Sequence, residues 1–208
     1  AGPLFVGGVI FPPTTNYEPF DSRSSLRASE RIKYLESLGI DDSKKLKPNE
    51  RKTLAKVIQN ECLAYHISKV DISIINRLGI GKATFIAMRA VVKNLREILR
   101  LSRQVGVAQD EPRIFVIVDG FHVKYLKGIG LENQLGIVGG DGISLSIAAA
   151  SIIAKVARDN HMKRLSAKFK EYGWGKNKGY GTNFHRAQLA KFGPTPLHRT
   201  DFIKNLPL

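Results

Sequence analysis

The chain has 208 residues, of which 43% are hydrophobic and 25% charged, so its composition is globular and excludes a disordered or collagen-like chain. An excess of 33 Lys and Arg over 18 Asp and Glu gives a formal net charge of +15, which favours nucleic acid as the partner. Cys62 is the only cysteine and no apolar stretch could span a bilayer, so disulfides and cysteine-based zinc clusters are excluded, and we expect a cytoplasmic protein with no membrane partner.

The first half of the chain predicts strands and helices in alternation. The apolar run from Leu4 to Phe11, with its paired glycines, is typical of a buried strand, and the polar stretch from Pro13 to Ser25 predicts a loop. A helix is expected from Pro48, because proline suits a first helical turn, and a strand from Ala64 to Val70. From Lys82 to Leu99 hydrophobic residues recur every three or four positions, which predicts an amphipathic helix that covers a sheet.

The second half predicts one more strand and one long helix. Ile114 to Val118 is uninterrupted, β-branched and aromatic, which is typical of a central strand covered on both faces. A helix is expected from Ser144 to Phe169, followed by a turn-rich basic tail. Strands interleaved with helices predict an α/β fold, a mixed β-sheet flanked by helices, with a main domain over 1–170 and a small basic C-terminal segment of helices and loops, 171–208, packed on it.

Three aspartates are candidate functional residues. Asp119 closes the most apolar strand and Asp141 follows two glycines, although either could equally be a turn residue. Asp159 is more informative, because it lies on the same helix face as Val156 and Met162, which should pack inward. A buried carboxylate needs either a Lys or Arg partner or a divalent cation, and we favour the cation, since the neighbouring Arg158 should point elsewhere.

Oxygen ligands without supporting cysteines predict Mg²⁺ or Mn²⁺ rather than zinc. Two such ions about 4 Å apart can stabilise both the attacking water and the leaving oxygen when a phosphodiester is cleaved. Asp119, Asp141 and Asp159 are therefore a hypothetical metal site for phosphodiester hydrolysis.

The tail supplies a hypothetical nucleic-acid-binding surface. From Lys155 to Lys204 there are twelve Lys and Arg against three acids. Four aromatic residues are interleaved with these charges, namely Tyr172, Trp174, Tyr180 and Phe184. Tyr180 stands between two glycines, where its ring and hydroxyl could meet a sugar, although core packing is nearly as plausible from this pattern alone.

Six motifs, in this order and spacing, resemble those of ribonuclease HII across nearly the whole chain. They are Asp42-Ser43-Lys44-Lys45-Leu46, Val118-Asp119-Gly120, Gly140-Asp141, the run from Ala148 to Asp159, Asn177-Lys178-Gly179-Tyr180-Gly181-Thr182, and Gly193-Pro194-Thr195 with His198-Arg199. The resemblance implies a ribonuclease H-like fold. It also implies an endonuclease that hydrolyses RNA in RNA–DNA hybrids and incises at single ribonucleotides in duplex DNA, leaving a 3′-hydroxyl and a 5′-phosphate.

The resemblance also assigns roles to single residues. Asp119 and Asp141 correspond to metal ligands, and Asp159 looks like a further aspartate that assists metal binding. Tyr180 is similar to a tyrosine that stacks near the RNA–DNA junction and senses the 2′-hydroxyl. The other residues expected to bind nucleic acid are Gly2, Ser43, Lys44, Lys178, His198 and Arg199. The partner is then an RNA–DNA hybrid or ribonucleotide-containing duplex DNA, bound by a monomer.

The chain departs from the family pattern at three places. The family reads Asp-Glu-x-Gly-Arg-Gly-Pro-Leu where this sequence opens Ala1-Gly2-Pro3-Leu4, so the Asp-Glu pair of metal ligands is absent. We expect that pair to belong to residues missing from this sequence, and we expect the chain as printed to be inactive or nearly so. Gly139 replaces a usual lysine, and the segment Leu78 to Lys82 lacks the usual Asn and Gln.

Two other functional classes remain open from the sequence alone. A non-catalytic module that binds nucleic acid through the basic tail is the main alternative, and the absent Asp-Glu pair supports it. A structural, ribosome-associated protein would explain the charge, but it gives no reason for a carboxylate on an apolar helix face.

Overall fold

The computed structural model describes residues 1–11, 22–40, 43, 45–103 and 114–204 of the chain. The helices and strands are β1 (Leu4–Ile10), α1 (Ser22–Ser37), α2 (Pro48–Glu61), β2 (Ala64–Val70), α3 (Ile72–Leu78), α4 (Ile80–Arg103), β3 (Val116–Asp119), β4 (Gln134–Ile137), α5 (Leu145–Leu165), α6 (Trp174–Asn177), α7 (Asn183–Phe192) and α8 (Thr200–Ile203). Short 3₁₀ helices are η1 (Leu131–Asn133), η2 (Gly140–Gly142) and η3 (Lys170–Tyr172).

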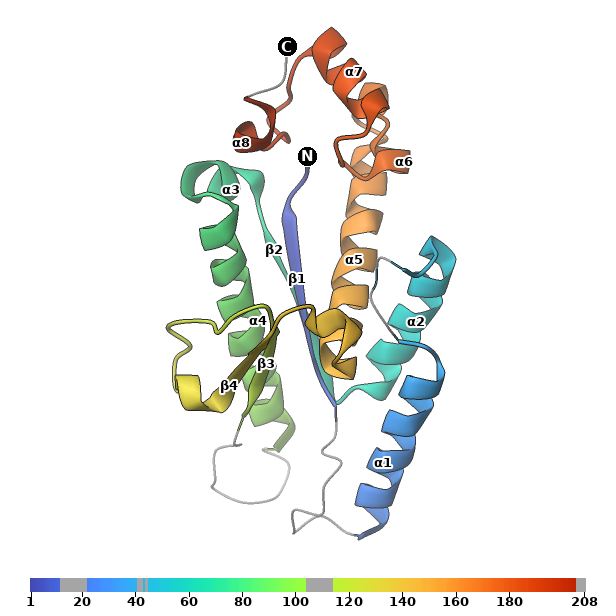
Figure 1. Ribbon diagram of the computed structural model, residues 1–208, viewed down its shortest axis with the longest axis vertical. Helices are drawn as coiled ribbons and strands as arrows, with labels where there is room; N and C mark the ends of the chain where they lie inside the picture. Colours follow the sequence, from blue (N-terminus) through green and yellow to red (C-terminus); the bar gives the residue numbers. More distant parts are fainter. Residues whose placement is uncertain (12–21, 41–42, 44, 104–113, 205–208) are drawn as a thin grey trace.

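The described strands form two separate pairs. β1 and β2 are antiparallel, in register from Leu4 opposite Val70 to Ile10 opposite Ala64. β3 and β4 are parallel, with Asp119 opposite Ile137 at the end of the ladder. Figure 1 shows the β1–β2 ladder running between the long helices α4 and α5, which both contact it.

Helix α4 connects the two strand pairs because two of its faces are apolar. One face packs its small residues Ala83 and Ala87 against the β1–β2 pair. Another packs Phe85, Met88 and Val92 around Val118 of β3 and the residues that follow it. A 24-residue amphipathic helix thereby fixes where the end of β3 lies relative to the rest of the fold.

Several sequence predictions are confirmed by these elements. The strands at Leu4 and at Ala64–Val70 and the helix from Pro48 are present, the last with Glu50 accepting the Lys47 backbone N–H at 2.7 Å. The amphipathic helix extends over Ile80–Arg103, and the α/β class is correct. Among the described helices, none combines the length and apolar character that a bilayer crossing requires.

Other predictions were wrong. The run Ile114 to Val118 is not a central strand covered on both faces, because α4 covers only one face and leaves Phe115 57% and Ile117 41% exposed. Within the described residues the hydrogen-bonded strands form two pairs, one antiparallel and one parallel, and helices flank them as the predicted fold class requires. Helix α1 begins at Ser22, inside the stretch expected to be a loop, whose residues 13–21 lie outside the described part.

Three further elements differ from the prediction: helix α5 in its end, and helix α3 and strand β4 in being present at all. Helix α5 ends at Leu165, four residues before Phe169, because the chain continues in turns. Helix α3 and strand β4 had no expected counterpart, because seven and four residues are too short for a clear period.

Candidate functional site

Asp119 and Asp141 lie beside each other at the carboxyl end of the β3–β4 pair. Asp119 ends β3, and its Oδ1 accepts a hydrogen bond from the backbone N–H of Gly140 at 3.0 Å. Gly140 directly precedes Asp141 in η2, and the Gly120 N–H extends the ladder by donating to Ile137 O at 2.8 Å. Two residues 22 positions apart therefore reach the same edge, as the sequence analysis expected.

The two glycines before Asp141 lie where a larger residue would be unfavourable, each for a different reason. Gly139 has φ +67°, a left-handed conformation that other residues adopt only at a cost. Gly140 is buried, and a Cβ there would lie 2.5 Å from Cδ1 of Ile147 in the first turn of α5. The departure from the family at Gly139 thus coincides with a backbone conformation that suits glycine better than lysine.

Asp159 does not join the other two aspartates, which corrects the expected three-aspartate site. It lies fourteen residues after the first residue of α5, which is about 21 Å along the helix axis. No group of three His, Cys, Asp or Glu side chains within the described residues is placed to hold a metal ion. The described metal-ligand candidates are therefore the Asp119 and Asp141 pair.

The charge of Asp159 is balanced by basic side chains. Its carboxylate lies 3.3 Å from Lys155 Nζ, 3.6 Å from Arg51 Nη2 and 4.0 Å from Arg158 Nη1. Arg51 also donates to the backbone carbonyls of Ser43 and Leu46, at 2.8 and 2.6 Å. Of the two partners considered for a buried Asp159, basic side chains are the ones present, so the electrostatic argument for a metal at this position is removed.

Tyr180 lies directly beside this ion-pair cluster. Lys155 Nζ donates to the Tyr180 hydroxyl at 2.8 Å, and the Arg158 guanidinium carbon lies 4.6 Å from the ring centroid. Burial acts to raise the pKa of Tyr180, but the Lys155 hydrogen bond and the charge of Arg158 outweigh it and lower that pKa. The ring nevertheless remains 52% exposed, so its outer face is open to a ligand.

A buried chain of hydrogen bonds holds the backbone of Tyr180. Thr195 N–H donates to His198 Nδ1 at 2.9 Å, so the proton of His198 is on Nε2, which lies 3.2 Å from His185 Nε2. Trp174 Nε1 donates to that same His185 nitrogen at 3.1 Å. The proton of His185 is therefore on Nδ1, which donates to Tyr180 O at 2.8 Å. Both rings are neutral, and burial lowers the pKa of His198 to about 4 and also lowers that of His185.

The aromatic residues of the tail divide into two classes. Tyr172 and Trp174 are buried with Met162 in a core cluster that attaches the tail to α5. Tyr180 and Phe184 are exposed, so only this second pair can belong to a binding surface.

The other residues expected to bind nucleic acid are mostly used internally. His198 is only 2% exposed, and the Ser43 hydroxyl is buried 3.0 Å from that of Ser151. The backbone carbonyl of the buried Gly2 accepts a hydrogen bond from Arg199 at 3.0 Å. Lys178 donates to the backbone carbonyl of Gly175. Of the residues predicted to bind nucleic acid, Tyr180 has an exposed side chain, whereas His198 is buried within the hydrogen-bond chain; Lys44 lies outside the described residues.

Sequence analysis missed Lys155 and Arg158 as partners of Tyr180. Lys155 and Asp159 are four residues apart on one helix, and that spacing predicts an ion pair. No comparable pattern links Lys155 to Tyr180, which is 25 residues away.

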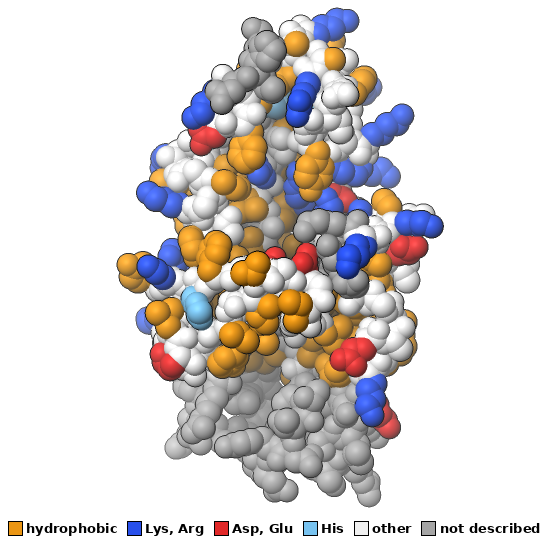
Figure 2. Space-filling view, in the orientation of Figure 1, with side chains coloured by type: hydrophobic (Ala, Val, Ile, Leu, Met, Phe, Trp, Pro, Cys, Tyr) orange, Lys and Arg blue, Asp and Glu red, His pale blue; other side chains and the backbone are white. Residues whose placement is uncertain are grey.

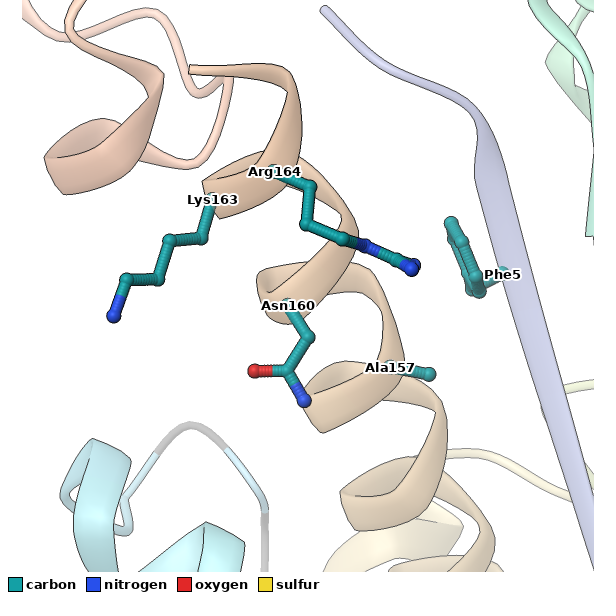
Figure 3. Close-up of a pocket in the computed structure, with 5 residues that line it drawn as sticks. All are labelled: Phe5, Ala157, Asn160, Lys163 and Arg164. Atoms are coloured by element: carbon teal, nitrogen blue, oxygen red, sulfur yellow. The ribbon is translucent and has the colours of Figure 1, made fainter. Parts of the chain in front are cut away.

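Charge is unevenly distributed over the face of the molecule seen in Figure 2. Acidic side chains occur near the middle of this face, and Lys and Arg side chains gather mostly over its upper half, toward α6 and α7. A hollow between β1 and α5 is lined by Phe5, Ala157, Asn160, Lys163 and Arg164 (Figure 3). By helical geometry these α5 residues lie largely on the other side of the helix from Lys155 and Asp159, so the hollow is separate from the Tyr180 cluster.

Comparisons with a family model and with known proteins all point to the same family. The family model described as Ribonuclease HII matches residues 25–205. Ribonuclease HII of Caldicellulosiruptor bescii is 37% identical over 206 residues, covering 99% of this chain and 82% of its own. Ribonuclease HII of Synechocystis sp. is 37% identical over 190 residues, covering 91% of both chains.

Solved structures share the fold. A PCNA:RNase HII complex from Archaeoglobus fulgidus contains a chain that is 25% identical, with a TM-score of 0.65, covering all of this chain and 90% of that one. Bst-RNase HIII in complex with Mn²⁺ is 19% identical, with a TM-score of 0.59, covering 84% of this chain and 58% of that one. The ribonuclease H-like fold expected from the sequence is therefore confirmed. Family match, sequence identity and fold agree with the motifs around Asp119, Asp141 and Tyr180: the chain belongs to the ribonuclease HII family.

Proposed function

We propose that the protein is an endonuclease that hydrolyses the RNA strand of RNA–DNA hybrids and incises at ribonucleotides in duplex DNA, leaving a 3′-hydroxyl and a 5′-phosphate. The observation that carries this proposal is the meeting of Asp119 and Asp141 at the edge from which α5 departs. Tyr180, whose ring is exposed, lies beside Lys155 and Arg158, two basic residues further along α5. Family membership supports the choice of substrate.

The Asp119 and Asp141 pair fits divalent Mg²⁺ or Mn²⁺ in its donor chemistry. Both side chains offer carboxylate oxygens, the ligands that hard cations prefer. The Gly140 N–H fixes the Asp119 carboxylate by binding Oδ1, which leaves Oδ2 for a cation. Bound in a pair, such ions would activate water and stabilise the leaving oxygen.

Tyr180 would recognise the ribose at the cleavage position. Because the Lys155 ammonium can only donate, the Tyr180 hydroxyl accepts from it, and the phenolic proton is left to donate to a substrate oxygen. The exposed ring face can stack on a sugar or a base. Lys155 and Arg158 add positive charge beside the path of the phosphates.

The remaining parts of the proposal follow from the same features. We propose that the metal is Mg²⁺ or Mn²⁺, that the protein acts as a cytoplasmic monomer, and that residues 171–208 act as a basic appendage of the catalytic domain. The packing of Trp174 and Leu189 on Met162 of α5 supports the last point. A non-catalytic nucleic-acid-binding role is the second candidate, favoured by the finding that only two acids meet within the described residues.

Cleavage of duplex DNA that contains one ribonucleotide tests the proposal. With Mn²⁺ present, we expect a chain extended at its start by the family's Asp-Glu pair, which serves as the wild type in this assay, to cut at the ribonucleotide. Asp119→Asn in that chain should lose at least about a hundredfold in rate, since a ligand to the metal is removed. Asp201→Asn is the matched control, because the Asp201 side chain is 56% exposed and forms an ion pair with the neighbouring Lys204. Equal rates for wild type and Asp119→Asn would exclude this site, and binding without any cleavage by the wild type would favour the non-catalytic role.

A further inference from the structure

Five basic side chains form a stripe along the outer face of α4. They are Lys82, Arg89, Lys93, Arg96 and Arg100. At 3.6 residues per turn, the five lie within roughly 60° of one another around the helix axis. Glu97 is the only acid in the α4 sequence, so the stripe is strongly positive along most of the helix. The opposite face is buried against β1 and β2 and cannot contribute to binding.

The segment 121–130, which leaves the end of β3, is fixed beside this stripe. Val123, Leu126 and Ile129 are buried against α4. Arg96 Nη1 donates to Lys127 O at 2.6 Å, and Val123 N–H donates to the buried Gln134 side chain at 2.9 Å. The segment carries two lysines and no acid. It is therefore a preformed, basic element next to the stripe.

This segment presents aromatic rings to the solvent. Tyr125 is 86% exposed and Phe121 is 60% exposed. Tyr125 has φ +62°, a left-handed conformation that residues with a Cβ rarely adopt. Arg89 lies below it, with its guanidinium carbon 5.5 Å from the Tyr125 ring centroid and its Nε donating to Lys124 O at 2.9 Å. An exposed ring held in an unfavourable backbone conformation adds little to the core, which points to a use outside the fold.

We propose that the α4 surface, defined as the five basic residues with Phe121 and Tyr125, binds the sugar–phosphate backbone of the substrate duplex to one side of the cleavage position. Guanidinium and ammonium groups bind phosphates, and exposed rings pack on sugars. The segment begins directly after Asp119-Gly120, so it leaves from the end of β3 that carries Asp119. In Figure 2, basic and hydrophobic side chains mingle along the edge of the molecule over α4.

The dimensions of α4 set the length of duplex that this surface would contact. The stripe from Lys82 to Arg100 spans about 27 Å, which corresponds to roughly eight base pairs of duplex. Binding to the α4 surface therefore requires a duplex that extends well beyond the cleavage position. The choice of a hybrid as the ligand rests on the proposed function, whereas the binding itself requires no divalent ion.

Fluorescence anisotropy in the presence of EDTA tests this inference. Two hybrids are compared, one of about 8 base pairs and one about three times as long. We expect Tyr125→Asn and Arg89→Gln each to weaken binding of the long hybrid about fivefold and to leave the short hybrid unchanged. Arg89→Gln should also reduce the slope of log affinity against log salt by about one. Asparagine tolerates the left-handed backbone, so circular dichroism should show that Tyr125→Asn remains folded.

Matched controls are Tyr34→Asn, on the exposed surface of α1, and Lys52→Gln, on that of α2; both should bind like the wild type. Wild-type affinity and salt slope for both test variants on the long hybrid would overturn the inference. Binding of an acidic polypeptide that depends on Tyr125 and Arg89, without a loss on the hybrid, would assign the surface to a protein partner and also overturn it. If the wild type binds as expected but never cleaves, only the proposed function fails.

Discussion

At the start of α5, Asp119 and Asp141 are positioned by a glycine-rich backbone, whereas further along the same helix Tyr180 is held by a network of side chains. A single backbone N–H fixes Asp119, on a turn where Gly139 has φ +67°. Tyr180 instead has its hydroxyl bonded to Lys155 and its carbonyl bonded to buried His185. Around Asp119 and Asp141 the backbone sets where the carboxylates lie. Around Tyr180, which we call the recognition region together with Lys155, Arg158 and His185, side chains hold the residue in place.

The two regions differ in which side chains take part in stabilising interactions. The Asp119 carboxylate accepts a hydrogen bond from the neutral backbone N–H of Gly140, which does not compete with a cation as a salt bridge would. The Asp159 carboxylate is instead paired with Arg51, Lys155 and Arg158, beside Tyr180. We therefore expect variants near the start of α5 to affect chemistry with little effect on stability, and variants in the Tyr180 network to affect stability and substrate choice.

The largest effect is expected at Asp141. In the chain extended by the Asp-Glu pair, Asp141→Asn should reduce Mn²⁺-dependent cleavage of a ribonucleotide-containing duplex about a thousandfold, because half of the described carboxylate pair is lost. Calorimetric titration of the chain without that extension should show weak Mn²⁺ binding, in roughly the millimolar range, since two carboxylates make a sparse site. Tight Mn²⁺ binding that survives Asp141→Asn would place the metal elsewhere.

The next largest effect is expected at His185, and it concerns stability. His185→Ala leaves Trp174 Nε1, His198 Nε2 and Tyr180 O without their partner and opens a cavity. We expect a loss of about 3 kcal/mol in the free energy of unfolding, measured by urea denaturation. His122→Ala, at an exposed position, is the control and should cost little. A loss at His185 no greater than at His122 would contradict the hydrogen-bond chain.

The spacing of hydrophobic residues along the chain predicted most of the helices and strands. The strand Ala64–Val70 was predicted at both ends, and the apolar stripe of α4 follows directly from its spacing. The two faces of β3 could not be predicted, because an apolar run does not say how many layers cover it. Its one-sided burial is a property of the packing rather than of the run itself.

Site residues were predicted where a strand or helix end fixed their position. Asp119 and the turn at Gly140-Asp141 reach one edge because β3 and β4 are parallel; the sequence placed Asp119 at a strand end but did not predict β4. Trp174 and Tyr180 stand in the same basic tail, yet one is fully buried and the other is half exposed. Nothing local distinguishes them; the difference comes from Met162, which lies twelve residues before Trp174 on α5.

A smaller effect on stability is expected from pH. The unfolded chain binds a proton at each histidine near pH 6.5, whereas buried His198 has its pKa lowered to about 4. The unfolded state therefore binds more protons between these values, so stability present above pH 6.5 is lost as the pH falls toward 4, by up to about 3 kcal/mol. His198→Gln should show a shallower fall over this interval, whereas His122→Gln should keep the wild-type slope. Identical slopes for wild type and His198→Gln would show that His198 is not buried in its neutral form.

The smallest effect tests whether Lys155 acts through the Tyr180 hydroxyl. We expect Tyr180→Phe and Lys155→Met each to lower kcat/KM on a single-ribonucleotide duplex by a factor of about five, and the double variant to lose no more than either single change, a coupling of about 1 kcal/mol. Tyr180→Ala should lose more than Tyr180→Phe, because the stacking ring is removed as well. Ultraviolet titration gives a readout independent of cleavage: since the Lys155 hydrogen bond lowers the pKa of Tyr180, Lys155→Met should raise it. Lys163→Met changes a residue that lines the hollow beside Phe5, and it is the control that should leave both the pKa of Tyr180 and kcat/KM on the single-ribonucleotide duplex unchanged. Losses that simply add in the double variant would mean that Lys155 and Tyr180 contact the substrate independently, and the recognition region would then be two sites rather than one.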